Sequence, residues 1–328
     1  MMLLDDRLIV ITGGAGFIGS HVVAHLNHLG YNNLIIFDDL GMNEKWKNLV
    51  GKKILDIYPK AACFDWIQGK EQSIASIIHL GACSSTVESN ASYLLENNYR
   101  YSVRLAEYAL LNDIRFIYAS SAATYGNGEQ GFKDDENQLD NLKPLNMYGL
   151  SKHLFDLWLM NQGVLNRVTG LKYFNVFGPN EGHKGRMASA IYHMFPVAKN
   201  EKVVRLFQSS EPEKYKDGEQ MRDFIYAKDA AKMTVAFLNN QATGIFNIGC
   251  GKPETWNYLA TCLFEALDIP PNIEYIPMPI DLIGKYQNYS AAPMEKTIAA
   301  IGASAHPTPL KEAVTDYIKN HLLLGRPW

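Results

Sequence analysis

The first half of the chain alternates short apolar segments with longer amphipathic segments. The apolar segments are predicted strands: 8–12 (LIVIT), 34–39 (LIIFDD), 75–82 (ASIIHLGA), 115–121 (RFIYASS) and 168–178 (VTGLKYFNVFG). Between them the pattern predicts helices at 20–29, at about 93–111 and from about residue 148 onward. Strands that alternate with helices form right-handed crossovers and a parallel sheet. Because several of these strands are apolar nearly throughout, we expect helices on both faces of the sheet.

After Gly178 the alternation is less regular and prolines are more frequent. Segments 222–240 and 244–251 still predict a helix and a strand that return to the sheet, whereas the charged stretch 211–220 predicts a solvated insertion. The sequence therefore indicates an α/β protein with a Rossmann-type doubly wound parallel sheet and a smaller α/β substrate-binding lobe toward the C-terminus. We expect residues 1–178, with 222–250, to form the sheet domain, and 179–328 mainly to form the lobe.

Composition restricts the possible partners. The chain has 328 residues, of which 47% are hydrophobic and 20% charged, as is usual for a globular protein. A net charge of -3 argues against binding nucleic acid through a general basic field. The four cysteines form no C-x-x-C pair of the kind that binds metal or carries out redox chemistry: they are Cys63, Cys83, Cys250 and Cys262. We expect reduced thiols and no metal site.

The N-terminal sequence argues against secretion. Asp5, Asp6 and Arg7 interrupt what would be the apolar part of a signal peptide. No apolar run reaches the roughly 20 residues that a membrane-spanning helix needs. We therefore expect a cytoplasmic protein without a membrane partner.

A glycine-rich turn joins the first predicted strand to the first predicted helix. The stretch ITGGAGFIGS (11–20) places glycines at 13, 16 and 19. Gly13 permits a tight turn, Gly16 lets the backbone approach a pyrophosphate, and Gly19 lets helix and strand pack closely. The start of the helix offers unpaired N–H groups and a partial positive charge to phosphates. With Asp38 at the end of the second strand, this context predicts a dinucleotide-binding domain.

The choice of dinucleotide is left open by the residues alone. Asp38 would accept hydrogen bonds from the adenosine ribose, which favours NAD. Lys45, with Lys52, Lys53 and Lys60 further on, could instead neutralise the additional phosphate of NADP.

Tyr148 and Lys152 provide candidate chemistry. At i and i+4 on a helix they share one face, and we expect the ammonium group to lower the pKa of the phenol toward working pH. Tyr148 could then exchange a hydroxyl proton while a hydride moves to or from nicotinamide. The hydroxyls of SSAATYG (120–126), at the end of a predicted strand, could bind the reacting oxygen.

These features resemble the extended short-chain dehydrogenase/reductase family, whose members act on nucleotide sugars. The matching motifs are TGGAGFIG (12–19), HLGACSST (79–86), YASSAATYG (118–126), PLNMYGLSK (144–152), YFNVFGP (173–179) and RDFIY (222–226). Ala122-Ala123-Thr124 stands where dehydratases of this family carry an acidic pair, which favours an epimerase or a reductase. Within the family, EGHKGRMAS (181–189), with KYQ (285–287), is similar to epimerases that act at C6 of ADP-heptose.

The resemblance implies oxidation of ADP-heptose to a 6-keto intermediate and its re-reduction by bound NADP. Tyr148 and Lys184 would be the two acid/base groups, Lys152 would tune Tyr148, and Ser121 would bind the oxygen on C6. The implied substrate contacts are Ser121, Asn175, Arg186, His193, Phe207, Gln208, Ser209, Ser210, Arg222 and Tyr286. The implied cofactor contacts are Gly13, Gly16, Phe17, Ile18, Gly19, Asp38, Asp39, Lys45, Lys60, Leu80, Gly81, Ala82, Cys83, Ser84, Asn97, Lys152, Val176 and Lys184. It also implies a homo-oligomer that serves lipopolysaccharide biosynthesis.

Two departures from the family pattern accompany the insertion at 211–220. Arg186 stands where we expect a serine, and Leu80 replaces an acidic residue. We interpret His183 as a residue that stabilises its loop, and Tyr173, Phe174 and Phe177 as core residues.

Two alternative functions would use parts of the same pattern. A 4-epimerase or reductase of another nucleotide sugar would share Tyr148 and Lys152 but would not need Lys184. A dinucleotide-binding sensor without catalysis is disfavoured, because both Tyr148 and Lys152 are present.

Overall fold

A parallel sheet of seven strands forms the centre of the computed structural model, which describes residues 6–279 and 287–328. The strand order is β11-β6-β5-β4-β1-β2-β3. The strands are β1 (Leu8–Thr12), β2 (Leu34–Phe37), β3 (Asp56–Tyr58), β4 (Ile74–His79), β5 (Arg115–Ser121), β6 (Thr169–Tyr173) and β11 (Gly244–Ile248). The order reverses between β1 and β4, which is where a doubly wound sheet opens a crevice at the carboxyl ends of its strands. The predicted fold class is confirmed.

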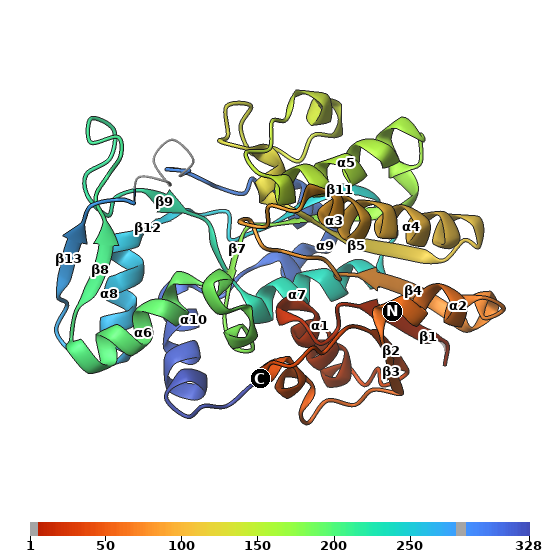
Figure 1. Ribbon diagram of the computed structural model, residues 1–328, viewed down its shortest axis with the longest axis horizontal. Helices are drawn as coiled ribbons and strands as arrows, with labels where there is room; N and C mark the ends of the chain where they lie inside the picture. The colour runs from red at the N-terminus through yellow and green to blue at the C-terminus, as the bar shows by residue number, and fades with distance from the viewer. Residues whose placement is uncertain (1–5, 280–286) are drawn as a thin grey trace.

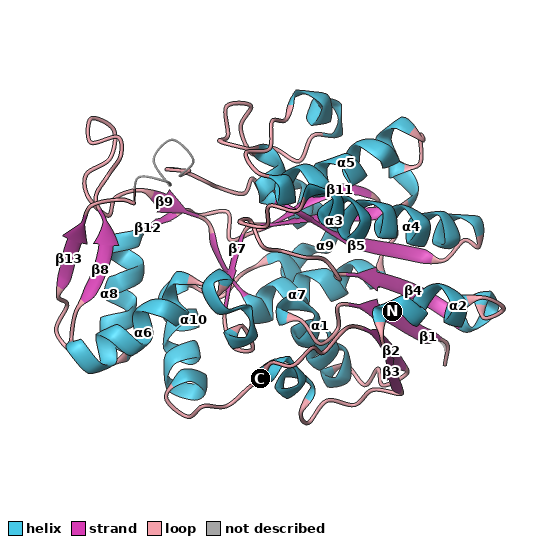
Figure 2. Cartoon of the chain, in the orientation of Figure 1, coloured by secondary structure: helices cyan, strands magenta, loops and turns pink. Residues whose placement is uncertain are grey.

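Helices cover both faces of this sheet (Figure 1). On one face α1 (Phe17–His28) packs against α7 (Ala227–Ala236), and on the other lie α4 (Tyr101–Leu111) and α5 (Met147–Asn161). Shorter helices complete the layers: α2 (Cys63–Ile67), α3 (Ala91–Leu94) and α9 (Glu295–Ile301) (Figure 2). A π-helical turn, Leu95–Arg100, joins α3 to α4. Because both faces are covered, every residue of β2, β4, β6 and β11 is buried.

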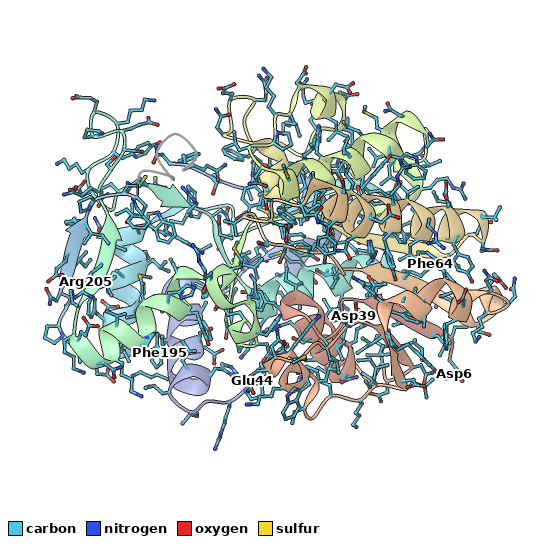
Figure 3. All side chains as sticks on the ribbon, in the orientation of Figure 1. Asp6, Asp39, Glu44, Phe64, Phe195 and Arg205 are labelled. Carbon is cyan, nitrogen blue, oxygen red and sulfur yellow. The ribbon has the colours of Figure 1, made fainter. Side chains whose placement is uncertain are left out.

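A second, smaller lobe lies beside the carboxyl ends of the strands (Figure 1). It consists of α6 (Ala190–Glu201), β8 (Val204–Phe207), α8 (Trp256–Ala266), β13 (Ile273–Ile276) and α10 (Leu310–Asp316). β8 and β13 form a parallel pair, and the lobe has an apolar core of its own, which includes Ile191, Leu263 and Tyr317. Arg205 lies at the outer side of this lobe, far from Asp39 in the sheet domain (Figure 3).

Two predicted elements differ from the structure. The expected strand 168–178 is divided into β6 and β7 (Asn175–Phe177), because the backbone of Asn175 turns to bond with Asp223 and β7 pairs with β10 (Phe224–Tyr226) in a separate sheet. The expected helix over 222–240 begins only at Ala227, after β9 (Met221–Arg222) and β10; β9 pairs with β12 (Glu254–Thr255). β11 pairs with β6 at the edge of the main sheet.

A buried ion pair joins α5 to the sheet. Asp156 on α5 and Lys172 on β6 are 0% and 1% exposed, and their oxygen and nitrogen atoms are 2.7 Å apart. The Asp156 carboxylate also accepts hydrogen bonds from Tyr118 (2.9 Å) and Ser120 (2.8 Å) on β5, and Lys172 donates to Thr124. These contacts fix α5 relative to β5 and β6.

We predict that Asp156→Ala strongly destabilises the fold, because it leaves the Lys172 ammonium buried without a counter-charge. The expected loss in the free energy of unfolding, measured by urea titration, is about 3–5 kcal/mol. Replacing both partners by apolar residues (Asp156→Leu with Lys172→Met) should recover most of it.

The matched control is Glu265→Ala, which removes an ion pair with Lys311 whose side chains are 45% and 59% exposed. It should change stability little. An Asp156→Ala variant as stable as this control would contradict the importance assigned to the buried pair.

Candidate active site

A cavity of about 800 Å³ lies at the carboxyl ends of the strands. The turn after β1, the loop after β4, the end of β5, the start of α5 and the loop after β7 line it, and Trp256 and Leu259 of the second lobe complete it. A smaller cavity of about 260 Å³ shares Gly13, Asp38, Lys45 and Gly81 with it. The two cavities therefore adjoin at the point where the strand order reverses.

The glycine turn has no room for side chains. Gly13 has φ +71°, and a Cβ atom there would lie 2.6 Å from the Cα of Gly81. A Cβ atom on Gly19 would lie 2.1 Å from the carbonyl oxygen of Gly13. Gly16 is the N-cap of α1 and has no side chain to bond the helix, so the first N–H groups of the helix are available to a ligand. This backbone cradle fits the pyrophosphate of a dinucleotide.

Two aspartates and two lysines surround the smaller cavity. Asp38 accepts hydrogen bonds from the backbone N–H of Ala15 (2.9 Å) and from the Lys45 amine (2.5 Å). The Lys60 amine lies 3.5 Å from Asp39 and donates to Asn97 (2.8 Å). This end of the site therefore offers carboxylates to ribose hydroxyls and ammonium groups to a phosphate.

Tyr148, Lys152 and Ser121 line the main cavity together. Lys152 is 3% exposed, and its amine donates a hydrogen bond of 2.9 Å to the carbonyl of Ala119 on β5. Burial lowers the pKa of Lys152 to about 8. Burial also raises the pKa of Tyr148, and the hydrogen bond with Ser121 offsets this only in part. The expectation that Lys152 lowers the pKa of Tyr148 below its ordinary value is therefore wrong for the chain alone, because burial of the phenol dominates.

Lys184 lines the same cavity. It lies in the segment Gly182–Met187, on the loop between β7 and α6. Its amine lies 4.9 Å from the centre of the Phe17 ring at the start of α1. Burial lowers the pKa of Lys184, and the negative charge of Glu181 partly offsets this shift. The next residue, Gly185, has φ +53°, a conformation that glycine adopts without strain, so the loop can reverse there.

His183 holds this loop to the sheet domain. Its Nδ1 lies 3.0 Å from the carbonyl of Asn180 and 3.2 Å from the side-chain nitrogen of Asn48. These contacts support the interpretation of His183 as a loop-stabilising residue.

Most of the predicted site residues meet at the two cavities. Those that line the main cavity are Gly13, Gly16, Phe17, Ile18, Gly19, Asp38, Asp39, Lys45, Leu80, Gly81, Ala82, Cys83, Ser84, Ser121, Tyr148, Lys152, Asn175, Val176 and Lys184. Lys60 and Asn97 line the smaller one.

The remaining predicted substrate contacts lie elsewhere. Arg186 and His193 are exposed, and neither they nor 207–210 belong to the described lining of either cavity. Arg222 is 6% exposed, and its guanidinium carbon lies 5.9 Å from the centre of the Trp256 ring. Tyr286 falls outside the described residues. The roles of these residues stay predictions.

Several lining residues were not among the predicted site residues. Met187, Phe224 and Trp256 form apolar parts of the wall. Met187 and Phe224 lie in the motifs 181–189 and 222–226 but were given no role there, and Trp256 lies outside every motif. Phe174 and Phe177, interpreted as core residues, are 6% and 2% exposed and also reach the cavity.

The described residues contain neither a grouped set of metal-binding side chains nor a helix suited to span a membrane. Within residues 6–279 and 287–328, no three or more His, Cys, Asp or Glu side chains are grouped so that they could hold a metal ion. None of the helices seen there combines the length and apolar character required to cross a membrane.

Comparison with known proteins places the chain in a family. Residues 9–249 match the NAD dependent epimerase/dehydratase family. ADP-L-glycero-D-manno-heptose-6-epimerase of Nitratidesulfovibrio vulgaris (strain DP4) is 46% identical over 97% of this chain and 99% of its own. The enzyme of the same name from Fusobacterium nucleatum subsp. nucleatum is 41% identical over 96% and 98%.

A solved structure agrees with these relatives. The crystal structure of Helicobacter pylori ADP-L-glycero-D-manno-heptose-6-epimerase superposes with a TM-score of 0.77 at 29% identity, covering 98% of this chain and 99% of that chain. The chain therefore belongs to the NAD dependent epimerase/dehydratase family and, within it, groups with the ADP-L-glycero-D-manno-heptose-6-epimerases.

Proposed function

We propose that this epimerase interconverts ADP-D-glycero-D-manno-heptose and ADP-L-glycero-D-manno-heptose by inverting C6. The observation that carries the proposal is that Tyr148 on α5 and Lys184 on the loop after β7 reach one cavity from different elements. We infer the substrate from the ADP-L-glycero-D-manno-heptose-6-epimerases that this chain resembles. The reaction is a transient oxidation to a 6-keto sugar followed by reduction from the opposite face.

Two acid/base groups suit this reaction better than one. The chemistry that NADP supplies when bound is reversible hydride transfer at a fixed position. The keto sugar must therefore turn about its C5–C6 bond to present its other face, and its oxygen then lies at a different side of the cavity. Tyr148 exchanges the proton of the C6 hydroxyl in one pose, and Lys184 exchanges it in the other.

The surroundings of the two groups shift their pKa values in different directions. Burial lowers the pKa of Lys184, which favours its neutral form. The hydrogen bond between Ser121 and Tyr148 lowers the pKa of the phenol and offsets part of the rise that burial causes. A charged Lys152, one helical turn away, would act in the same direction.

We propose NADP rather than NAD as the cofactor. The support is that Lys45 neutralises Asp38, and Lys60 lies beside Asp39, at the end of the site where the adenosine ribose would be held. Asp38 without Lys45 would repel a 2′-phosphate.

The remaining assignments follow from the same relatives. The second lobe would hold the sugar nucleotide, since Trp256 and Leu259 complete the cavity. We further propose a cytoplasmic homo-oligomer that acts in lipopolysaccharide biosynthesis, with ADP-heptose as its small-molecule partner.

The direct test is incubation of the purified protein with ADP-D-glycero-D-manno-heptose, following the configuration at C6 by NMR. We expect both epimers to appear without net consumption of cofactor. Conversion of UDP-hexoses, with ADP-heptose left unchanged, would instead support the alternative of a 4-epimerase.

Tyr148→Phe and Lys184→Met should each lower kcat by at least about 100-fold, because each removes one general acid/base. The affinity for NADP, measured by fluorescence titration, should change much less. Lys199→Met is a matched control: its amine also lies near a ring, 5.7 Å from the centre of Phe195, but on the exposed side of α6. Near-normal turnover of Lys184→Met would discard the two-base reaction.

Lys45→Ala should weaken NADP by about 10- to 100-fold more than NAD, because a charged hydrogen bond is lost and Asp38 is left unneutralised. Titration of both cofactors against the unaltered and variant proteins measures the ratio. An equal loss for both cofactors, or preference of the unaltered protein for NAD, would contradict the assignment.

A further inference from the structure

The carboxylate of Glu181 is buried within the loop that carries Lys184 and accepts several hydrogen bonds. Glu181 is 0% exposed. It accepts hydrogen bonds from the backbone N–H (2.6 Å) and the hydroxyl (2.6 Å) of Ser189, from the hydroxyl of Tyr317 (2.9 Å) and from the backbone N–H of Gly178 (3.4 Å). A carboxylate has about four acceptor sites, so this set of donors fits its ionised form.

These contacts join three parts of the molecule. Gly178 is the first residue after β7, Ser189 is the N-cap of α6, and Tyr317 comes from the helical turn Tyr317–Leu322 of the second lobe. The two ends of the loop 178–189 are therefore fastened to one side chain. The backbone N–H of Lys184 donates to the carbonyl of Glu181 (2.9 Å), which places Lys184 one turn further along the chain.

Packing alone would not require an ionisable side chain at position 181. A buried carboxylate is costly unless hydrogen bonds and a counter-charge compensate for its lost hydration. Burial raises the pKa of Glu181, and the hydrogen bonds from Ser189 and Tyr317 and the positive charge of Lys184 oppose this rise. The charge of Glu181 in turn opposes the lowering of the Lys184 pKa by burial. The carboxylate thus has an electrostatic effect on the side chain that lies in the cavity.

We propose that Glu181 is a positioning residue for Lys184: it closes the loop at both ends and supplies the negative charge that keeps the Lys184 amine in its place over Phe17. The proposal deepens the proposed function, on which it rests, by naming what holds the second acid/base group. Removal of the carboxylate should disturb Lys184 while leaving the site of the dinucleotide, on the turn after β1, intact.

Other titratable groups face these two residues and must be considered in any pH experiment. Near Lys184 they are His183 on the same loop, Lys45 and Asp38 of the sheet domain beyond it, and Tyr148 and Lys152 across the cavity. Near Glu181 they are Tyr317 and, from α6, Tyr192. Glu181 is the negative group that acts most directly on Lys184.

The test compares Glu181→Gln with Tyr317→Phe in the full chain. Gln keeps the size of the side chain but removes its charge, whereas Phe removes one donor to the carboxylate and leaves the charge. The rate at which acetic anhydride labels Lys184 is measured against pH by mass spectrometry, and kcat with ADP-heptose and NADP affinity are measured alongside. Only the neutral amine is labelled, so the midpoint of the labelling curve reports on its protonation.

In Glu181→Gln the midpoint should move to lower pH, because the ammonium form of Lys184 loses its counter-charge. The displacement of the loop should lower kcat by about 100-fold, while NADP affinity changes less than about 3-fold. Tyr317→Phe should keep the midpoint of the unaltered protein. An unchanged midpoint in Glu181→Gln overturns the proposal, whatever the turnover.

The labelling result does not depend on the identity of the substrate. If the unaltered protein fails to convert ADP-heptose, the proposed function fails, but the shift of the midpoint still decides whether Glu181 acts on Lys184.

Discussion

The buried ion pair between Asp156 and Lys172 determines where the chemistry of this protein can occur. Asp156 lies on α5, one turn after Lys152, and Lys172 lies on β6, while the donors from β5 bind the same carboxylate. Tyr148, Lys152 and Ser121 are carried by these elements. A shift of α5 would leave a buried charge uncompensated, so the helix has one permitted position. The glycine turn after β1 then sets the place of the dinucleotide relative to that helix.

Much of the fold could be predicted because local patterns of apolar and turn residues mark its strands and its first crossover. β1, β4 and β5 are mainly apolar segments, and the glycine turn at 13–19 identifies the first crossover. The pairing of β7 with β10, and of β8 with β13, could not be predicted in the same way. Each pair joins short segments that are distant in the sequence, so only the tertiary structure reveals their partners.

In the candidate site, too, some features follow from the sequence and others only from the folded structure. Tyr148, Lys152 and Lys184 could be named as candidates because they lie in recognisable motifs, and all three line one cavity. The direction of the Tyr148 pKa could not, since it depends on burial that spacing does not encode. Glu181 is part of a recognisable motif, yet its contact with Tyr317, far along the chain, exists only in the folded molecule.

In the proposed reaction the Tyr148 phenol and the Lys184 amine serve one sugar carbon from two sides. A crystal structure of the protein with NADP and an ADP-heptose analogue tests this arrangement most directly. The account predicts that the Tyr148 oxygen and the Lys184 nitrogen each lie within about 3 Å of a position that the C6 oxygen can occupy, on either side of the nicotinamide C4. A Lys184 amine directed into solvent and remote from the sugar in that complex would contradict it.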